Sequence, residues 1–462
     1  MATKLNARSP FYTASQFDQN LTKGELLLYV YTGTKNTDKG TAKYNLTKSN
    51  TISYQYTGFG NLKGISFEIS ELVRDYLDVA FNGTYTNYNR WVTVEQLFHI
   101  SGTTVTGTNS STGSSQLIDS SVTFAATLQG KYVKNEATGA VALITDVDDS
   151  TLTLNANIFP SSPIAYTAGL TYNTADYISY DGYGYFKDGR NPELSQSYLQ
   201  SNKKMYRPQD HNIRIAVDTD VATSATFRLK GQTVRTQTFT ASNESDVQVV
   251  YFNVGSTDAD TYKQRVKLDD GTVEDTPLLR EFFGAENVGE VDQIYISDAN
   301  KTEVITIETE PCSIYDTYKA VFVNKFGVLQ DLYFTRKSTE SFATTGETFK
   351  ANTFDYTIAS SVELVGGVGN KYNSNKHQVQ QFNKLGKESI TLNTGYISED
   401  YNEVFKELML SEQVWLVKTD TADILPVIPK TNSLTFKTSI NDNLIQYSVD
   451  FDMAFDKINS IR

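Results

Sequence analysis

The segment LIQYSVDFDMAF at residues 444–455 alternates apolar and polar side chains with a period of two. The apolar positions are Ile445, Tyr447, Val449, Phe451 and Met453. A helix repeats its apolar positions every three or four residues, so this pattern excludes a helix and predicts a strand with one buried face. The intervening polar positions include Asp450 and Asp452, so we expect the other face to meet water or a basic neighbour.

The composition extends the β prediction to the whole chain. Of 462 residues, 29 are Tyr and 25 are Phe, and these residue types are typical of pleated, half-buried strands. Hydrophobic residues make up 39% of the chain, which is too apolar for a disordered protein. At this length we expect about two to four domains. The predicted fold class is mainly β, with several β-sandwich or Ig-like modules and a C-terminal α+β domain.

The domain organisation follows from changes of amino-acid composition along the chain. Residues 101–130 hold one charged residue, Asp119, among many Ser, Thr and Gly, and short strands with turn residues follow at 131–169. The segments on both sides resemble one interrupted element, which is typical of an inserted domain. The predicted domains are an N-terminal β domain at 1–100, continued by 173–211; an inserted small Ig-like β module at 101–172; a middle β-sandwich domain at 212–311; and a C-terminal α+β domain at 312–462.

Several local elements can be predicted from turn and capping residues. Hairpins are predicted over 44–59, 293–308 and 319–338, and helices after Ser70, over 276–284 and over 398–412. The last helix has Ser398 as its predicted cap. It carries one apolar stripe, formed by Tyr401, Val404, Phe405, Leu408 and Met409.

The chain lacks the residue clusters that common catalytic and metal sites need. Its one cysteine, Cys312, can form neither an internal disulfide nor a zinc site, and it lies in an acidic segment without a nearby histidine. His99 and His211 are interpreted as partly buried structural residues. The aspartates at 146–149 and 218–220 are interpreted as solvated turns because no calcium loop surrounds them. We therefore predict no catalytic residue, no metal ion and no cofactor.

Charge and hydropathy exclude further classes of protein. The 41 basic and 54 acidic side chains give a net charge of −13, so we expect no specific nucleic-acid binding. No apolar run approaches the roughly 18 residues of a membrane helix, so no membrane anchor is expected. The first residues contain no hydrophobic stretch of the kind found in secretory signals.

The segment YISYDGYGYFKDG at 177–189 combines five aromatic residues with three glycines. One interpretation is a tight hairpin with aromatic cross-strand pairs. The other is an exposed aromatic surface for a protein partner or a glycan. The residues of this candidate surface are Tyr177, Tyr180, Tyr183, Tyr185 and Phe186.

Six stretches toward the two ends of the chain carry a resemblance to a known family. They are NARSPFY, ELLLYVYTG, ISFEISELVRDYL, FVNKFGVLQDLYFTRKS, KESITLNTGYISEDYNEVFKELMLSEQVWL and SINDNLIQYSVDFDMAFDKINSIR. These stretches resemble virion proteins of tailed bacteriophages of Bacteroidota, including crAss-like phages. The resemblance covers most of the chain outside 101–170, and 131–169 is similar to small β modules inserted in phage structural proteins. It implies a virion protein of the tail or neck, assembled in the host bacterial cytoplasm, and it brings no catalytic or ligand motif.

Three functions remain open at this point. The first is a non-enzymatic subunit of a tail or neck ring, hub or baseplate. Its partners would be other copies of itself in a ring and neighbouring virion proteins, with ring contacts from the N- and C-terminal parts and the inserted module outside. The second is a host receptor- or glycan-binding fibre protein that uses the insertion or the aromatic surface. The third is a glycan-cleaving enzyme with a pair of acidic residues.

Overall fold

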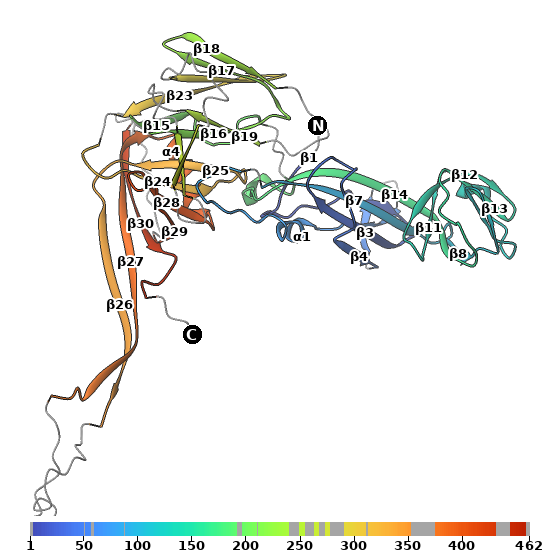
Figure 1. Ribbon diagram of the computed structural model, residues 1–462. Coiled ribbons are helices and arrows are strands. Elements are labelled where there is room, and N and C mark those ends of the chain that lie inside the picture. The colour runs from blue at the N-terminus through green and yellow to red at the C-terminus, as the bar shows by residue number, and fades with distance from the viewer. Residues whose placement is uncertain are drawn as a thin grey trace, which may run out of the picture.

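The computed structural model describes residues 3–49, 51–56, 60–86, 88–191, 196–209, 211–239, 249–254, 263–267, 273–277, 291–310, 313–352, 375–430 and 444–458. Figure 1 shows a central body, an arm that leaves it on one side, and a narrow ribbon of two strands that leaves it in another direction. Strands account for 55% of the structure and helices for 6%, so the prediction of a mainly β chain is confirmed.

Long antiparallel strands form the arm. β3 (Leu21–Tyr31), β7 (Arg90–Ile100) and β14 (Ala165–Tyr180) lie side by side, with β4 (Tyr44–Lys48) outside β3 and β1 (Thr3–Asn6) parallel to β14. Both faces of β3 are covered, as its continuous apolar run predicts. Leu26, Leu28 and Val30 enter one cluster of buried residues, and Tyr29 and Tyr31 enter another.

A second, smaller sheet covers part of this arm. It contains β2 (Gln16–Asp18), β6 (Gly60–Ile65) and β5 (Ile52–Tyr56), and the short helix α1 (Ser70–Arg74) follows. The predicted hairpin over 44–59 is wrong, because β4 pairs with β3 whereas β5 pairs with β6. Ser70 lies inside the first turn of α1 and does not cap it.

The residues between β7 and β14 form a module with its own core at the far end of the arm (Figure 1). Its strands are β8 (Val105–Thr108), β9 (Ser111–Gly113), β10 (Gln116–Ile118), β11 (Tyr132–Asn135), β12 (Val141–Asp148) and β13 (Thr151–Leu154). Leu117, Ile144 and Phe159 are among its fully buried residues. The strands predicted within 131–169 are present, and β14 continues without a break from the module into the arm.

The middle of the chain forms two facing sheets around one apolar core, a sandwich-like arrangement. The larger sheet has the order β15 (Lys204–Pro208), β23 (Thr302–Glu310), β22 (Gln293–Asp298), β17 (Ala222–Leu229), β18 (Gln232–Thr238), and the smaller one pairs β16 (Ile213–Asp218) with β19 (Val249–Val254). Because β15 pairs with β23, residues 204–208 join the middle sheet rather than the N-terminal domain to which the sequence assigned them.

The predicted helix over 276–284 is wrong at its start. Thr276 and Pro277 end strand β21 (Val273–Pro277), which pairs with β20 (Lys263–Lys267). The remaining residues of that predicted helix lie outside the described part of the chain.

The C-terminal sheet has seven strands and one helix packed on it. The order is β25 (Leu329–Phe334), β24 (Tyr318–Val323), β28 (Val414–Lys418), β29 (Ile424–Pro429), β30 (Leu444–Met453), β27 (Val379–Ser398), β26 (Thr339–Lys350). Helix α4 (Tyr401–Leu410) buries Tyr401, Val404, Phe405 and Leu408 in the same core, as the stripe predicts. The residue at its N-cap is Asp400 instead of Ser398, and Asp400 makes no side-chain capping bond.

The alternation at 444–455 corresponds to β30, whose Tyr447, Val449 and Phe451 are buried. On its polar face Asp452 pairs with Lys430, with 3.2 Å between Oδ1 and Nζ. The expected basic neighbour is therefore present.

The separate core of the module leads to a prediction about stability. Replacing Ser101–Leu170 by Asn-Gly joins β7 to β14 near Phe98 and Thr171, which already face each other. The change removes an ion pair between Lys134 and Glu25, whereas the apolar clusters of arm and module are distinct. We expect the remaining chain to fold, with a thermal midpoint lowered by no more than about 5 °C. Aggregation or loss of cooperative unfolding in differential scanning calorimetry would show that arm and module share one core.

Candidate assembly surface

The ribbon formed by β26 and the outer half of β27 projects away from the body (Figure 1). The two strands pair from Thr339 opposite Thr391 to Lys350 opposite Val379. Every residue of β26 is exposed, whereas the inner half of β27 also pairs with β30, from Ser389 to Ser398. The same strand is therefore held in the core at one end and exposed at the other.

Local contacts explain why the ribbon is a regular pair of strands. The Phe349 and Phe382 rings meet edge to face, with 5.7 Å between their centroids. The Phe342 ring lies over Gly386, where an added Cβ would come within 2.7 Å of a ring carbon. Such aromatic cross-strand contacts stabilise an antiparallel pair by about 0.2–1 kcal/mol each.

These contacts leave much apolar surface exposed to solvent. The exposed fractions are 59% for Phe342, 46% for Phe349, 45% for Phe382 and 52% for Val379. An isolated two-stranded hairpin is marginally stable in water, and a clustered set of exposed apolar side chains is typical of a protein interaction site. The ribbon is therefore the best candidate surface for assembly in the described part of the chain.

The ribbon also offers two backbone edges. Within the described residues, β26 has no strand partner on its outer side. The outer side of β27 is covered by β30 from Ser389 onward, and Lys457 N donates to Gly386 O at 2.9 Å. The outer side is therefore open from Val379 to Leu385. Open edges carry unpaired N–H and C=O groups that can pair with another chain.

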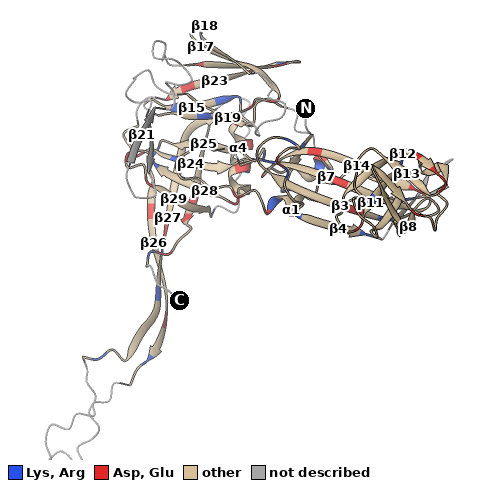
Figure 2. Ribbon diagram, turned by 45° about the vertical axis from the view of Figure 1, so that its right-hand side comes forward, with Lys and Arg blue, Asp and Glu red and all other residues tan. Residues whose placement is uncertain are grey.

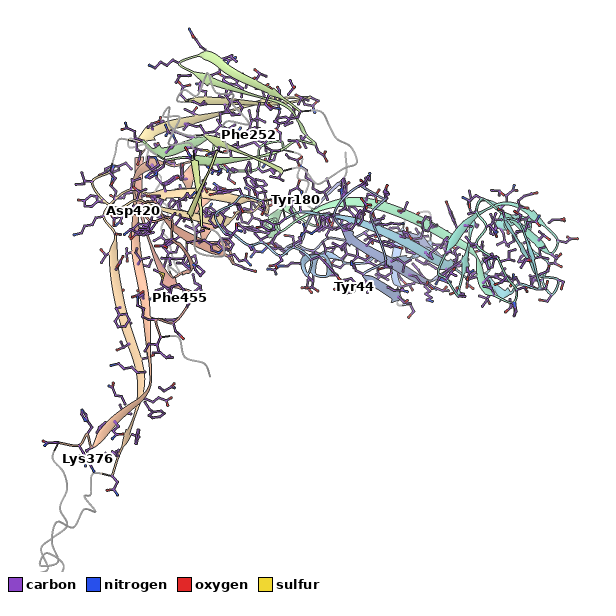
Figure 3. All side chains as sticks on the ribbon, in the orientation of Figure 1. Tyr44, Tyr180, Phe252, Lys376, Asp420 and Phe455 are labelled. Carbon is purple, nitrogen blue, oxygen red and sulfur yellow. The ribbon has the colours of Figure 1, made fainter. Side chains whose placement is uncertain are left out.

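Charged residues are spaced along the ribbon (Figure 2). β26 carries Glu340, Glu347 and Lys350, and the exposed half of β27 carries Lys384 and Lys387. Lys376 lies just before β27, at the far end of the described ribbon (Figure 3). None of these side chains forms an ion pair with another residue that the structure describes.

The arm joins the body through buried polar contacts. Lys4 of β1 pairs with Asp218 of β16, and their side chains are only 3% and 2% exposed. The Tyr180 hydroxyl donates to the same carboxylate at 3.1 Å, and Figure 3 places Tyr180 where the arm meets the body. The interpretation of Asp218 as part of a solvated turn is therefore wrong, because its partners come from the arm.

A second charged cluster connects the N-terminal residues, the middle sheets and the C-terminal sheet. The Tyr85 hydroxyl of the arm donates to Asp331 of β25, whose other carboxylate oxygen accepts from Arg214 N at 3.1 Å. Lys319 Nζ lies 4.0 Å from Asp331, and burial lowers the pKa of Lys319. Because one carboxylate contacts all three parts, this cluster restricts how the arm sits on the body.

The five aromatic residues of the candidate glycan surface do not form an exposed patch. Tyr177 and Tyr180 are buried, with exposed fractions of 7% and 2%. Tyr183 and Tyr185 are half-buried, and Phe186 alone is fully exposed. The predicted hairpin is also wrong, because β14 ends at Tyr180 and a short 3-10 helix follows at Phe186–Asp188. The segment forms the joint between arm and body.

Helix α4 supplies the acidic side of this joint. The Tyr185 hydroxyl donates to Glu403 at 2.7 Å, and Lys325 Nζ lies 3.5 Å from Glu403 and 3.7 Å from Glu407. The Glu407 side chain is fully buried and accepts a hydrogen bond from Ser201. Burial raises the pKa of Glu407 to about 7. No local pattern in the sequence marks this residue, because its partners are distant in the chain.

A cavity of about 270 Å³ lies between the arm sheet and the module. It is lined by Glu25, Glu95 and Lys134 among other residues, and each of these three is already paired. The hydrogen bond from His99 is the main reason why the pKa of Glu25 lies well below its usual range. The cavity therefore presents internal ion pairs instead of free ligand-binding groups.

No protein-family model matches the chain, and no curated protein matches it. Within the described residues, none of the helices has the length and apolar character that crossing a bilayer requires. In that same part of the chain, no three side chains of the metal-ligating types converge.

Glu407 leads to a prediction about pH. Its pKa is 4.5 in an unfolded chain and about 7 in the folded protein, so the folded state holds a proton that the unfolded state releases between these values. Its contribution to the free energy of unfolding is therefore lost as pH rises through 7, by about 3 kcal/mol at most. Glu407→Gln should flatten the fall between pH 5 and pH 8 and raise stability at pH 8, measured by urea unfolding.

Glu403 provides the matched control on the same helix. Its pKa is lowered, through hydrogen bonds from Tyr185 and Lys406 that outweigh the effect of burial, so its ionised form stabilises the fold. Glu403→Gln should therefore lower stability at pH 8. If the two glutamine variants behaved alike at pH 8, the assignment of a neutral Glu407 would be wrong.

Proposed function

We propose that this protein is a structural subunit of a tailed-bacteriophage virion, in a ring, hub or baseplate of the tail or neck, and that it assembles as a homo-oligomeric ring. The ribbon of β26 and β27 is the observation that supports this proposal most directly. Its phenylalanines remain about half exposed although they contact other residues of the ribbon, and its open edges have no strand partner among the described residues. A subunit that assembles needs a neighbour to cover such a surface, whereas an enzyme that works as a monomer does not.

The shape of the chain supports an assembly role in a second way. The arm and the ribbon leave the body in different directions (Figures 1 and 2). The buried pair of Lys4 with Asp218 and the cluster around Asp331 attach the arm through specific contacts. Surfaces that are held apart at fixed angles suit contacts with two different neighbours, as in a closed ring.

The resemblance to phage virion proteins supplies the identity of the particle in this proposal. The finer architecture belongs to it as well: an Ig-like inserted module, a C-terminal α+β domain, and a location in the virion after assembly in the host cytoplasm. The negative net charge of −13 suits a tail component that must not retain DNA.

The glycan-binding alternative has less support from the geometry. An aromatic platform for a sugar needs neighbouring exposed rings, and the proposed patch offers only Phe186. The module at the far end of the arm is the remaining place for a host contact, since it stands farthest from the body along the arm (Figure 1).

The ribbon can be removed to test the proposal. Replacing Phe342–Glu388 by Asn-Gly joins Ser341 to its cross-strand neighbour Ser389, whose hydroxyls lie 2.6 Å apart. We expect the full-length protein to form closed multimers in mass photometry and negative-stain microscopy, and the shortened protein to be a folded monomer. The deletion removes none of the residues of the C-terminal core, so its thermal midpoint should stay within about 5 °C.

The module deletion described above provides the control. It also removes a large exposed segment, but it should leave the multimers intact. A full-length protein that stays monomeric at micromolar concentration would contradict self-assembly. Multimers that survive removal of the ribbon would show that another surface makes the contact.

A further inference from the structure

We infer that the outer edge of β27 in one copy pairs with β26 of the next copy, so that the ribbons of a ring close into one antiparallel barrel. The occupant of the open edges is thus a second copy of this chain. This inference rests on the proposed self-assembly and specifies the interface that carries it.

The direction of the two strands supplies the first argument. β26 and β27 run antiparallel within one ribbon. In a ring with cyclic symmetry and ribbons along the axis, all ribbons point the same way. β27 of one copy then lies antiparallel to β26 of the next, which is a favourable pairing repeated at every interface. Closure pairs both open edges, and full closure is the arrangement that abolishes sheet edges.

The extent of the open edges supplies the second argument. The open part of β27 runs from Val379 to Leu385. Within one ribbon, Val379 faces Lys350 and Leu385 faces Thr345. Neighbouring ribbons at equal height would place the same segments opposite each other across the interface. Next to the body, β27 is occupied by β30, so pairing between copies is confined to the outer part of the ribbon.

The aromatic rings along these edges supply the third argument. Within one ribbon Phe382 contacts Phe349, which lies diagonally across from it. In the same register across the interface, Phe349 of one copy lies diagonal to Phe382 of its neighbour. Aromatic rings at such positions stabilise paired strands.

Cysteine cross-linking between two variants tests this pairing. In a Cys312→Ser background, Thr348→Cys in one protein and Gln381→Cys in another should form mixed disulfides, because these positions face each other in the proposed register. Disulfides only between two Thr348→Cys chains would indicate two-fold pairing of β26 with itself and would overturn the inference. A ring without mixed disulfides would reject this interface but keep the proposed function, whereas a monomeric original protein would reject both.

Discussion

The twenty-residue strand β27 ties the exposed ribbon to the buried core, and the rest of the architecture depends on this connection. Its inner half buries Ile390, Leu392 and Ile397 against the strands and helix of the C-terminal sheet. Its outer half has almost no buried side chain. Because one continuous strand belongs to both regions, the direction of the ribbon is determined by the packing of the core. A flexible loop of the same length would have to be ordered on binding, at a large entropic cost.

A continuous strand and buried contacts also hold the arm in place. β14 runs from the module through the arm to the joint, and the buried charges of Lys4, Asp218 and Asp331 lie where arm and body meet. Buried ion pairs add little net stability compared with apolar packing, but leaving one charge unpaired is costly. A joint built in this way favours one orientation of the arm over others. The chain therefore presents its module and its ribbon at defined positions, which a repeating assembly requires.

The sequence predicted those elements whose signal is local. The alternation at 444–455, the turn between β24 and β25 and the stripe on α4 each correspond to an element of the expected type. Strand partners were less predictable, since the strands within 44–59 both exist but pair elsewhere. Pairing depends on residues that are distant in the chain, and local patterns do not contain that information.

In the candidate site, too, local patterns mark some segments but do not predict their distant contacts. The aromatic segment at 177–189 stands out in the sequence, but its burial depends on Asp218 and on Glu403 of α4, far along the chain. The ribbon was missed because β26 is exposed on both faces, so that its sequence lacks the alternation that marks a half-buried strand. The one signal in the sequence of β26 was the presence of apolar residues, such as Phe342 and Phe349, in a segment without period-two alternation.

The central claim is that the ribbon is completed by a neighbouring copy. Hydrogen–deuterium exchange of the β26 amides, measured at protein concentrations below and above assembly, tests it most directly. The account predicts that amides between Thr345 and Lys350 exchange rapidly in the monomer and become protected as multimers form, while amides of the module do not change. Equal exchange of β26 at all concentrations, in a protein that does form multimers, would contradict it.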